Sequence, residues 1–305
     1  MNPVIQLSHL SKRYKEFAAV EDISLEIEKG EIYGFIGLNG SGKTTTIKML
    51  LGMIRPSQGT CYVQGQKVGL ANHSLWSKVG SLVETPYAYP ELTVEENLEI
   101  FRNLRRVSDT AAVQQVMEQL NLTGYAKKRA GKLSMGNTQR LGIAKALLHK
   151  PEILILDEPS NGLDPAGIIE VRELFRHLAH DLGVTIFMSS HLLSEVAKIA
   201  TNIGVIHQGQ LLQEIRVDQF KDLLNTRLVV DAREKEKALA ALNKAGYPSV
   251  FNAEGRIETT AEYAVRRPDE ISRYLVSEGI FPTHLVLEKE DLESYFLRVI
   301  TQRKE

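Results

Sequence analysis

The segment Gly37–Thr44 reads G-L-N-G-S-G-K-T, a complete G-x-x-x-x-G-K-[ST] phosphate-binding loop. Its glycines let the main chain wrap closely around phosphate oxygens, with the amide N–H groups pointing inward at a helix start. Lys43 offers a positive charge to the β- and γ-phosphates of a nucleotide, and Thr44 offers a hydroxyl to Mg²⁺. The residues expected to contact the nucleotide here are Gly37, Asn39, Gly40, Ser41, Gly42, Lys43, Thr44 and Thr45. The alternative is a glycine-rich turn with a chance lysine, which the flanking strand and helix disfavour.

Two adjacent carboxylates at the end of an apolar run supply the second part of this chemistry. Four apolar residues, Ile153–Leu156, are followed by Asp157 and Glu158. This places Asp157 at the carboxyl end of a buried strand, where open α/β sheets bind ligands, and a carboxylate there can hold Mg²⁺ directly or through water. Glu158 is the natural general base for a water that attacks the γ-phosphate. The alternative is that two acids merely end a strand at the surface.

A parallel sheet is needed to bring these groups together. The apolar run Ile32–Ile36 predicts a buried strand before the phosphate loop, and Thr45–Leu51 predicts a helix after it. Further strands are expected at Val4–Leu7, Ile23–Ile27, Thr60–Val63, Ile153–Leu156, Val184–Ser189 and Asn202–Ile206. Strands that alternate with helices predict an α/β fold with a parallel-sheet core.

A helical stretch interrupts the series of strands. Over residues 93–122, apolar residues recur at three- to four-residue spacing. Thr93 and Glu96 form a capping box, which marks a helix start. Asn137–His149 predicts another helix. Residues 91–149 are therefore expected to form a helical lobe of their own within a nucleotide-binding domain that spans residues 1–224.

The composition changes near Asn225. The remaining segment, 225–305, reads strand, helix, strand, strand, helix, strand and a last helix, and this βαββαβ order predicts a small ferredoxin-like α+β domain. The elements expected before the last helix are Leu228–Val230, Glu234–Ala245, Ser249–Asn252, Arg256–Thr260, Pro268–Ser277 and Thr283–Leu287. An apolar stripe on the last helix, which includes Tyr295 and Phe296, is interpreted as packing on the chain's own core rather than in a partner's groove.

A third motif makes the interpretation specific. The segment Leu133–Arg140 reads L-S-M-G-N-T-Q-R. With the two motifs above, it makes residues 4–217 similar to the ATP-binding subunits of the ATP-binding-cassette (ABC) transporter family. The resemblance implies a P-loop ATPase with a RecA-like parallel sheet, an antiparallel β subdomain and an inserted helical subdomain. In that family the matching segment reaches the γ-phosphate held by the opposite subunit, which assigns this role to Ser134 and Gly136. A helix N-terminus suits an anion, and a simple N-cap at Ser134 is compatible with this role.

Three further positions match the family. Tyr14, in S-K-R-Y, falls where the family stacks an aromatic ring on adenine. Asp164, at the end of S-N-G-L-D, resembles the loop that crosses the dimer interface, and it is counted with the nucleotide-binding residues. His191, in S-S-H-L, resembles the switch histidine that contacts the γ-phosphate. The alternatives are a packed tyrosine and a capping histidine.

The chain also departs from the family at a few positions. Where the family usually has a glutamine between the core and the helical lobe, Gly80–Pro86 contains Glu84. A carboxylate still offers Mg²⁺ an oxygen, but it loses the amide donor and adds a negative charge. This glutamate and the N-G-L-D-P sequence at Asn161–Pro165 are similar to the subgroup that exports bacitracin and lantibiotic-type peptides. Met135 and Asn137 depart from the signature as well, and they leave its serine and second glycine in place.

Composition excludes several other classes. A length of 305 residues suggests one large or two modest domains, and a net charge of −1 gives no reason to expect nucleic-acid binding. Cys61 is the single cysteine, so no internal disulfide can form, which fits a reducing compartment. No apolar stretch approaches the roughly 18 residues that span a bilayer, and the N-terminal residues show no signal-peptide pattern. The expected location is cytoplasmic, on the inner face of the membrane, with membrane contact made through partners.

The resemblance implies a homodimeric ATPase. Two copies would hold two Mg²⁺-ATP between the phosphate loop of one and the signature of the other. Hydrolysis through Lys43, Glu158 and His191 would power export through separate transmembrane permease subunits. One alternative is a soluble ABC-type ATPase acting on ribosomes or DNA, which usually carries two cassettes or a long coiled coil. Another is a regulatory dimer that ATP merely clamps, which would not need a base at Glu158.

Overall fold

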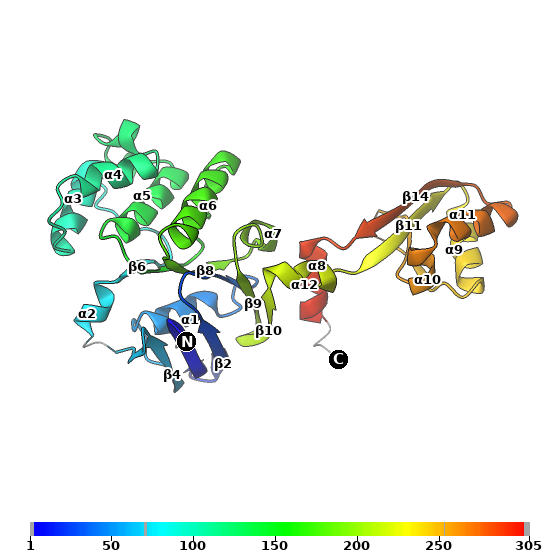
Figure 1. The fold of residues 1–305 in the computed structure, drawn as a ribbon, viewed down its shortest axis with the longest axis horizontal. Helices are drawn as coiled ribbons and strands as arrows, with labels where there is room; N and C mark the ends of the chain where they lie inside the picture. The colour runs from blue at the N-terminus through cyan, green and yellow to red at the C-terminus, as the bar shows by residue number, and fades with distance from the viewer. Residues whose placement is uncertain (1–2, 70–71, 253, 302–305) are drawn as a thin grey trace. The chain divides into compact units, whose positions relative to one another are not determined.

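The computed structural model describes residues 3–69, 72–252 and 254–301. The chain folds into two compact units, Met1–Asp218 and Gln219–Glu305 (Figure 1). The sequence-based division after residue 224 lies a few residues beyond this boundary. Each unit has its own sheets and its own hydrophobic core, so each is described separately.

Two sheets form the first unit. Its strands are β1 Ile5–Tyr14, β2 Phe17–Ile27, β3 Ile32–Ile36, β4 Gln58–Val63, β5 Gln66–Lys67, β6 Val79–Leu82, β7 Ile153–Leu156, β8 Thr185–Ser190, β9 Asn202–His207 and β10 Gln210–Arg216. One sheet has the order β10-β9-β3-β8-β7-β6; its pairs are parallel except for β10 with β9. The other sheet is antiparallel, with the order β2-β1-β4-β5. The predicted α/β class, with a parallel core and an antiparallel β subdomain, is confirmed.

The central strands are buried on both faces, which is why they read as unbroken apolar runs. Every residue of β3 and β7 is buried. Gly34 in β3 is needed for close packing, because a Cβ there would lie 2.2 Å from Cγ1 of Val196. β1 and β2 are longer than predicted. Exposed polar residues alternate with buried ones along both strands, so their apolar runs cover only part of each strand.

The helices of the first unit are α1 Lys43–Leu50, α2 His73–Trp76, α3 Val94–Leu104, α4 Ala112–Gln119, α5 Met135–Leu147, α6 Pro165–His180 and α7 Leu193–Val196. Figure 1 shows α3, α4 and α5 grouped as a lobe. The capping box predicted at the start of α3 is present: Glu96 N donates to Thr93 Oγ1, and Thr93 N donates to Glu96 Oε2. The helical stretch predicted over residues 93–122 is two helices, because the chain turns at Arg106, whose φ is 54°.

The second unit is a four-stranded antiparallel sheet with helices. Its elements are α8 Phe220–Leu223, β11 Thr226–Ala232, α9 Lys235–Lys244, β12 Ser249–Phe251, β13 Ile257–Thr259, α10 Glu262–Arg266, α11 Pro268–Ser277, β14 Pro282–Lys289 and α12 Leu292–Thr301. The strand order is β12-β13-β11-β14. α9, α10 and α11 bury their apolar residues against β11 and β13 in one core. On α12, Tyr295 and Phe296 are buried, and the Tyr295 ring packs 5.0 Å from Phe220, within the same unit.

Candidate nucleotide site

The carboxyl ends of β3, β8 and β7 are neighbours in the parallel sheet. The phosphate loop follows β3, Asp157 and Glu158 follow β7, and His191 follows β8. These segments meet at one edge of the sheet, and Gly37 N donates directly to Ser190 O at 3.2 Å. The edge is the one at which open α/β sheets bind ligands. Parallel pairing therefore brings together residues that lie more than a hundred positions apart in the sequence.

The phosphate loop has the features that a bound phosphate requires. A Cβ at Gly37 would lie 2.3 Å from Ser41 Oγ, and one at Gly42, whose φ is 109°, would lie 2.5 Å from Ala19 O. α1 starts at Lys43 without a side-chain cap, so its first N–H groups have no side-chain acceptor. Ser41 Oγ is buried and has no hydrogen-bond partner within the described residues. Together these groups fit an anion at the helix start.

The other predicted loop residues surround this site. Asn39 and Gly40 are exposed at the tip of the loop, and Gly40 has a φ of 79°. Thr44 and Thr45 lie half-buried in the first turn of α1.

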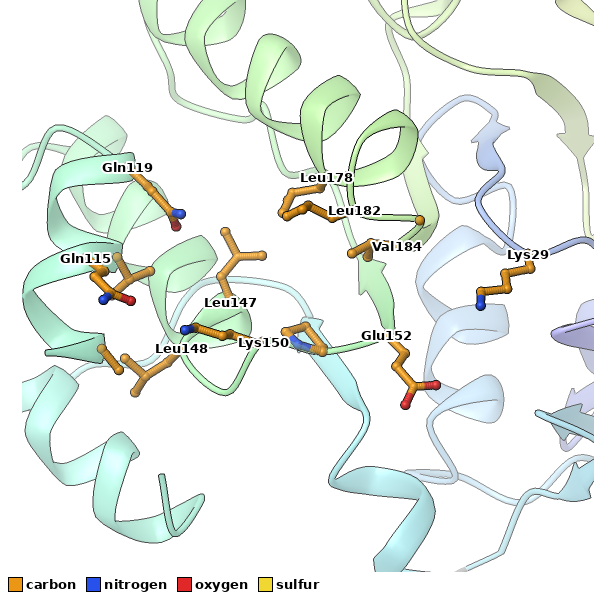
Figure 2. A pocket seen from close by; sticks show the side chains of 14 residues that line it. Lys29, Gln115, Gln119, Leu147, Leu148, Lys150, Glu152, Leu178, Leu182 and Val184 are labelled. Carbon is orange, nitrogen blue, oxygen red and sulfur yellow. The ribbon is translucent and has the colours of Figure 1, made fainter. Parts of the chain in front are cut away.

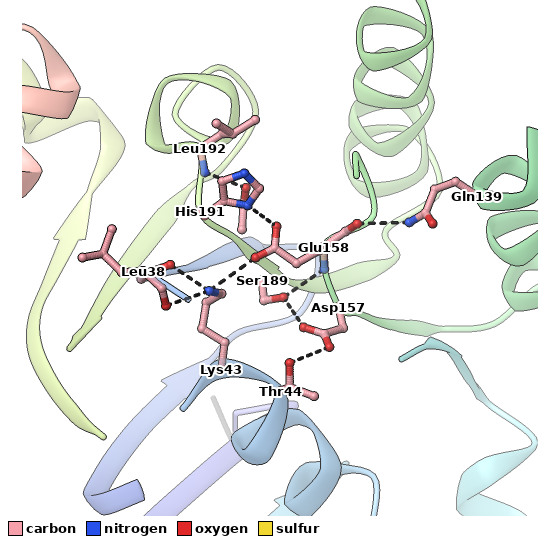
Figure 3. Close-up of polar contacts among 11 residues, drawn as sticks. Leu38, Lys43, Thr44, Gln139, Asp157, Glu158, Ser189, His191 and Leu192 are labelled. Atoms are coloured by element: carbon pink, nitrogen blue, oxygen red, sulfur yellow. Dashed lines mark hydrogen bonds and ion pairs between the residues drawn. The ribbon is translucent and has the colours of Figure 1, made fainter. Parts of the chain in front are cut away.

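Lys43 is held inside the loop. Its side chain is only 6% exposed, and Nζ donates to Gly37 O at 2.7 Å and to Leu38 O at 3.2 Å (Figure 3). The same ammonium lies 3.3 Å from Glu158 Oε1. The predicted phosphate ligand and the predicted base are therefore in direct contact.

Asp157 is fixed by two hydroxyl groups. Thr44 Oγ1 donates to Asp157 Oδ2 at 2.8 Å, and Ser189 Oγ donates to Asp157 Oδ1 at 2.6 Å (Figure 3). Hydroxyl and carboxylate oxygens that lie this close together form a set of ligands suitable for Mg²⁺. Ser189 was not predicted, and the one signal for it was a polar residue at the carboxyl end of the apolar run that became β8.

Glu158 is held at both its side chain and its main chain. Its Oε2 lies 2.8 Å from His191 Nδ1, and its N–H donates to Ser189 Oγ at 2.9 Å. Its carbonyl oxygen accepts from Gln139 Nε2 at 3.0 Å, and its φ of 48° is in the left-handed region, which a non-glycine residue rarely adopts. The structure thus brings Lys43, Glu158 and His191 into one contact group. The sequence did not single out Gln139 as part of it.

Glu84 lies beside this group, but its carboxylate forms an ion pair with a lysine outside it. Its Oε1 is 2.5 Å from Nζ of Lys48, which is on α1. Glu84, Thr44, Asp157 and Glu158 all line one cavity of about 450 Å³. The predicted metal ligands are therefore gathered around one space, with the Glu84 carboxylate bound to a lysine of the phosphate-loop helix.

The segment after Glu84 is anchored to the helical lobe. Lys145 of α5 donates to Tyr87 O at 2.7 Å, and Asn97 of α3 binds both the N–H and the C=O of Tyr89. Lys145 lies over the Phe101 ring at 4.4 Å, and burial lowers the pKa of its ammonium to about 8. These contacts connect the position of Glu84 to that of the lobe.

The signature residues form a different site on the same chain. Ser134 is the N-cap of α5, and its Oγ accepts from Asn137 N at 3.3 Å. Asp164 is the N-cap of α6 and accepts from Gly167 N at 2.9 Å. Ser134, Gly136 and Asp164 line a cavity of about 680 Å³ whose lining contains no phosphate-loop residue. Within one chain, therefore, Ser134 and Gly136 lie outside the group around Lys43, whereas Gln139 of the same segment contacts Glu158.

Tyr14 and Met135 are both exposed, and Met135 lines the two cavities described above. Tyr14 ends β1 with its side chain half exposed, and Lys12 Nζ lies 5.0 Å from the centre of its ring. It takes no part in the hydrogen-bonded group around Lys43 in the described residues, so its adenine role stays a prediction. Met135 is also exposed; it packs on Gly162, where a Cβ would lie 2.5 Å from Met135 Cγ.

A further cavity of about 340 Å³ lies at the opposite edge of the parallel sheet (Figure 2). Its walls come from α4, the end of α5, the end of α6 and the turn before β8, and they include Leu147, Leu178 and Val184. Lys29, Lys150 and Glu152 lie at its sides. None of the predicted site residues lines it, so it is separate from the nucleotide site.

Comparison with known proteins identifies the family. Residues 20–161 match the family profile described as ABC transporter. The chain is 37% identical over 302 residues to the bacitracin transport ATP-binding protein of Bacillus licheniformis, covering 98% of each chain. The chain belongs to the ABC transporter ATP-binding proteins. This ABC ATPase is also 33% identical over 238 residues to the lantibiotic transport ATP-binding protein of Streptococcus pyogenes, covering 75% of its own length and all of the relative.

The same family appears among solved structures. A bacterial ABC transporter cassette solved as a dimer matches with a TM-score of 0.64 and 25% identity, covering 70% of this chain and 98% of that one. The predicted family, its cassette fold and the ATPase activity are thereby confirmed. In the part of the chain that the structure describes, no helix combines the length and the apolar character needed to cross a bilayer.

Proposed function

We propose that this ABC ATPase works as a homodimer that hydrolyses two Mg²⁺-ATP to power the export of antimicrobial peptides through separate membrane subunits. The proposal rests mainly on the separation of two half-sites on one chain. Lys43, Asp157 and Glu158 form one half, and Ser134 and Gly136 line a different cavity. Two copies placed head to tail would complete both sites. The dimeric cassette among the similar structures supports a dimer.

The roles follow from the chemistry of each group. Lys43 and the loop N–H groups would bind the β- and γ-phosphates, Tyr14 would stack on adenine, and Ser134, Gly136 and Asp164 would act from the partner copy. Thr44, Asp157 and Glu84 would hold Mg²⁺, which would neutralise charge on the phosphates. In the described residues no cluster of three or more His, Cys, Asp or Glu side chains offers a self-contained metal site. A cation would therefore need the oxygens of the nucleotide as well.

Glu158 would perform the proton transfer. Its carboxylate would accept a proton from the attacking water, and the contacts with Lys43 and His191 would orient it toward the γ-phosphate. His191 could then turn to the γ-phosphate itself. ATP would favour the closed dimer, because bound phosphate contacts both copies, and hydrolysis would remove this preference.

Peptide export is inferred from the relatives. The names of two of them, a bacitracin and a lantibiotic transport ATP-binding protein, support an antimicrobial peptide as cargo. The subunit would act in the cytoplasm, on the inner face of the membrane, bound to the permease subunits. The ferredoxin-like domain, taken from the sequence as residues 225–305, would be an accessory domain to the nucleotide-binding domain. No nucleic acid is expected as a partner.

Purification from membranes tests this function against the alternatives. The tagged chain is expected to co-purify with a polytopic membrane protein and to release phosphate from ATP. Recovery with ribosomes or DNA instead would favour the soluble ATPase. Formation of an ATP-dependent dimer without phosphate release would favour the regulatory clamp. Either result would contradict the proposal.

Glu84→Ala is expected to uncouple hydrolysis from export. The carboxylate lies between the phosphate-loop helix, through Lys48, and the segment anchored to the lobe. Thr44 and Asp157 would remain, so ATP hydrolysis should persist within about 3-fold, whereas the peptide resistance of cells should fall about 10-fold. Phosphate release and the inhibitory peptide concentration measure the two effects. Glu91→Ala, an exposed position in the same segment, is the control; normal resistance with Glu84→Ala would refute the coupling role.

A further inference from the structure

We propose that Gln139 is a positioning residue that couples the signature helix α5 to the general base Glu158 of the same chain. Through it, nucleotide bound at one site of the dimer would set the base of the other site. The inference rests on the proposed head-to-tail dimer. It assigns a function to the part of the L-S-M-G-N-T-Q-R segment that lies beyond the anion-binding serine and glycine.

The donor of this contact is a buried side chain. The Gln139 side chain is 5% exposed, and its Nε2 donates to the carbonyl oxygen of Glu158 at 3.0 Å (Figure 3). Because the acceptor is main chain, the bond fixes the backbone of Glu158 rather than its carboxylate. A buried carbonyl that loses its donor costs about 1–3 kcal/mol, so this bond is hard to break without rearrangement.

Glu158 needs such support. Its φ of 48° is a left-handed conformation that costs a non-glycine residue about 1–2 kcal/mol. Its N–H is bound by Ser189 on β8, and its C=O is bound by Gln139 on α5. The backbone of the base is thus held from two elements, one in the sheet and one in the helical lobe. The direction of the Glu158 carboxylate therefore depends on both of these contacts.

One rigid helix carries both ends of the proposed coupling. Ser134 caps the N-terminus of α5, and Gln139 follows five residues later, about 7.5 Å along the axis. In the proposed dimer, Ser134 faces nucleotide bound to the partner's phosphate loop. Glu158 would act as the base for nucleotide bound to the phosphate loop of its own chain. A shift of α5 on nucleotide binding would therefore move Gln139 and re-aim the base of the other site.

The prediction is a loss of rate and of cooperativity with little loss of binding. Gln139→Glu keeps the size of the side chain but turns an acceptor toward the Glu158 carbonyl, and Gln139→Met removes the polar group altogether. Either change is expected to lower kcat about 10-fold, leave KM for ATP within about 2-fold, and reduce the Hill coefficient for ATP to about 1. A residue that merely stabilised α5 would lower the melting temperature without this split between kcat and KM.

The experiment measures ATPase kinetics and thermal unfolding on the full chain, with Gln115→Ala, an exposed change on α4, as the control. Two folded variants with unchanged kcat and Hill coefficient would overturn the proposal, as would non-cooperative hydrolysis by the unmodified protein. If one of the two Gln139 variants fails to fold, the kcat and Hill coefficient of the other variant test the proposal. The proposed dimer is tested separately, by size exclusion of Glu158→Gln with Mg²⁺-ATP. Failure to dimerise there would count against the dimer, and not only against the role of Gln139.

Discussion

Glu158→Gln is expected to lower steady-state ATP hydrolysis at least about 100-fold while ATP binding persists. The amide has nearly the same shape and can still meet Lys43 and His191, but it cannot accept the proton of the attacking water. General base catalysis is typically worth about 10²–10⁴-fold, so the loss should lie in this range. Phosphate release from purified protein measures it directly.

The same variant should hold ATP in a stable dimer. In the proposed dimer, ATP that is bound but not hydrolysed would keep its contacts with both copies, so the closed state should persist. Size exclusion with Mg²⁺-ATP is expected to show the dimer, and its absence would count against the shared site. Glu118→Gln, an exposed change on α4, should behave like the unmodified protein. Turnover of Glu158→Gln near the normal rate would rule out Glu158 as the base.

Lys43→Ala is expected to weaken ATP binding about 10- to 100-fold. The lysine is buried in the loop, and its ammonium donates to two main-chain carbonyls of the loop, which would orient it toward the phosphates. A charge-assisted hydrogen bond of this kind contributes about 1.5–3 kcal/mol, which sets the range. Calorimetric titration of the folded variant with Mg²⁺-ATP gives the affinity.

A surface lysine provides the comparison for that titration. Lys78, half exposed and paired with Glu152, lies outside the site. Its replacement with alanine should leave the affinity unchanged, since it removes a positive charge without touching the loop. Thermal unfolding separates a binding defect from a folding defect, because Lys43→Ala also removes the lysine that pairs with Glu158. Unaltered affinity in a folded Lys43→Ala protein would exclude the lysine as a phosphate ligand.

Features that depend on neighbours in the chain could be predicted from the amino-acid sequence. The spacing of Gly37–Thr44 and the apolar runs on each side predicted strand, loop and helix, because turn geometry and burial are set within a few residues. Asp157 and Glu158 were recognised because both directly follow an apolar run. The departure at Glu84 was visible for the same reason, through its place in a short motif.

The contacts between residues distant in the sequence became visible only in the folded chain. The strand order that puts β8 between β3 and β7 brings Ser189 against Asp157 and Glu158. The packing of α5 against the core brings Gln139 to the Glu158 carbonyl, and Lys48 of α1 forms an ion pair with Glu84. Periodicity reports which face of an element is buried, but it contains no information about the element that covers this face. The partners of the site were therefore set by strand order and helix packing, which depend on the whole core at once.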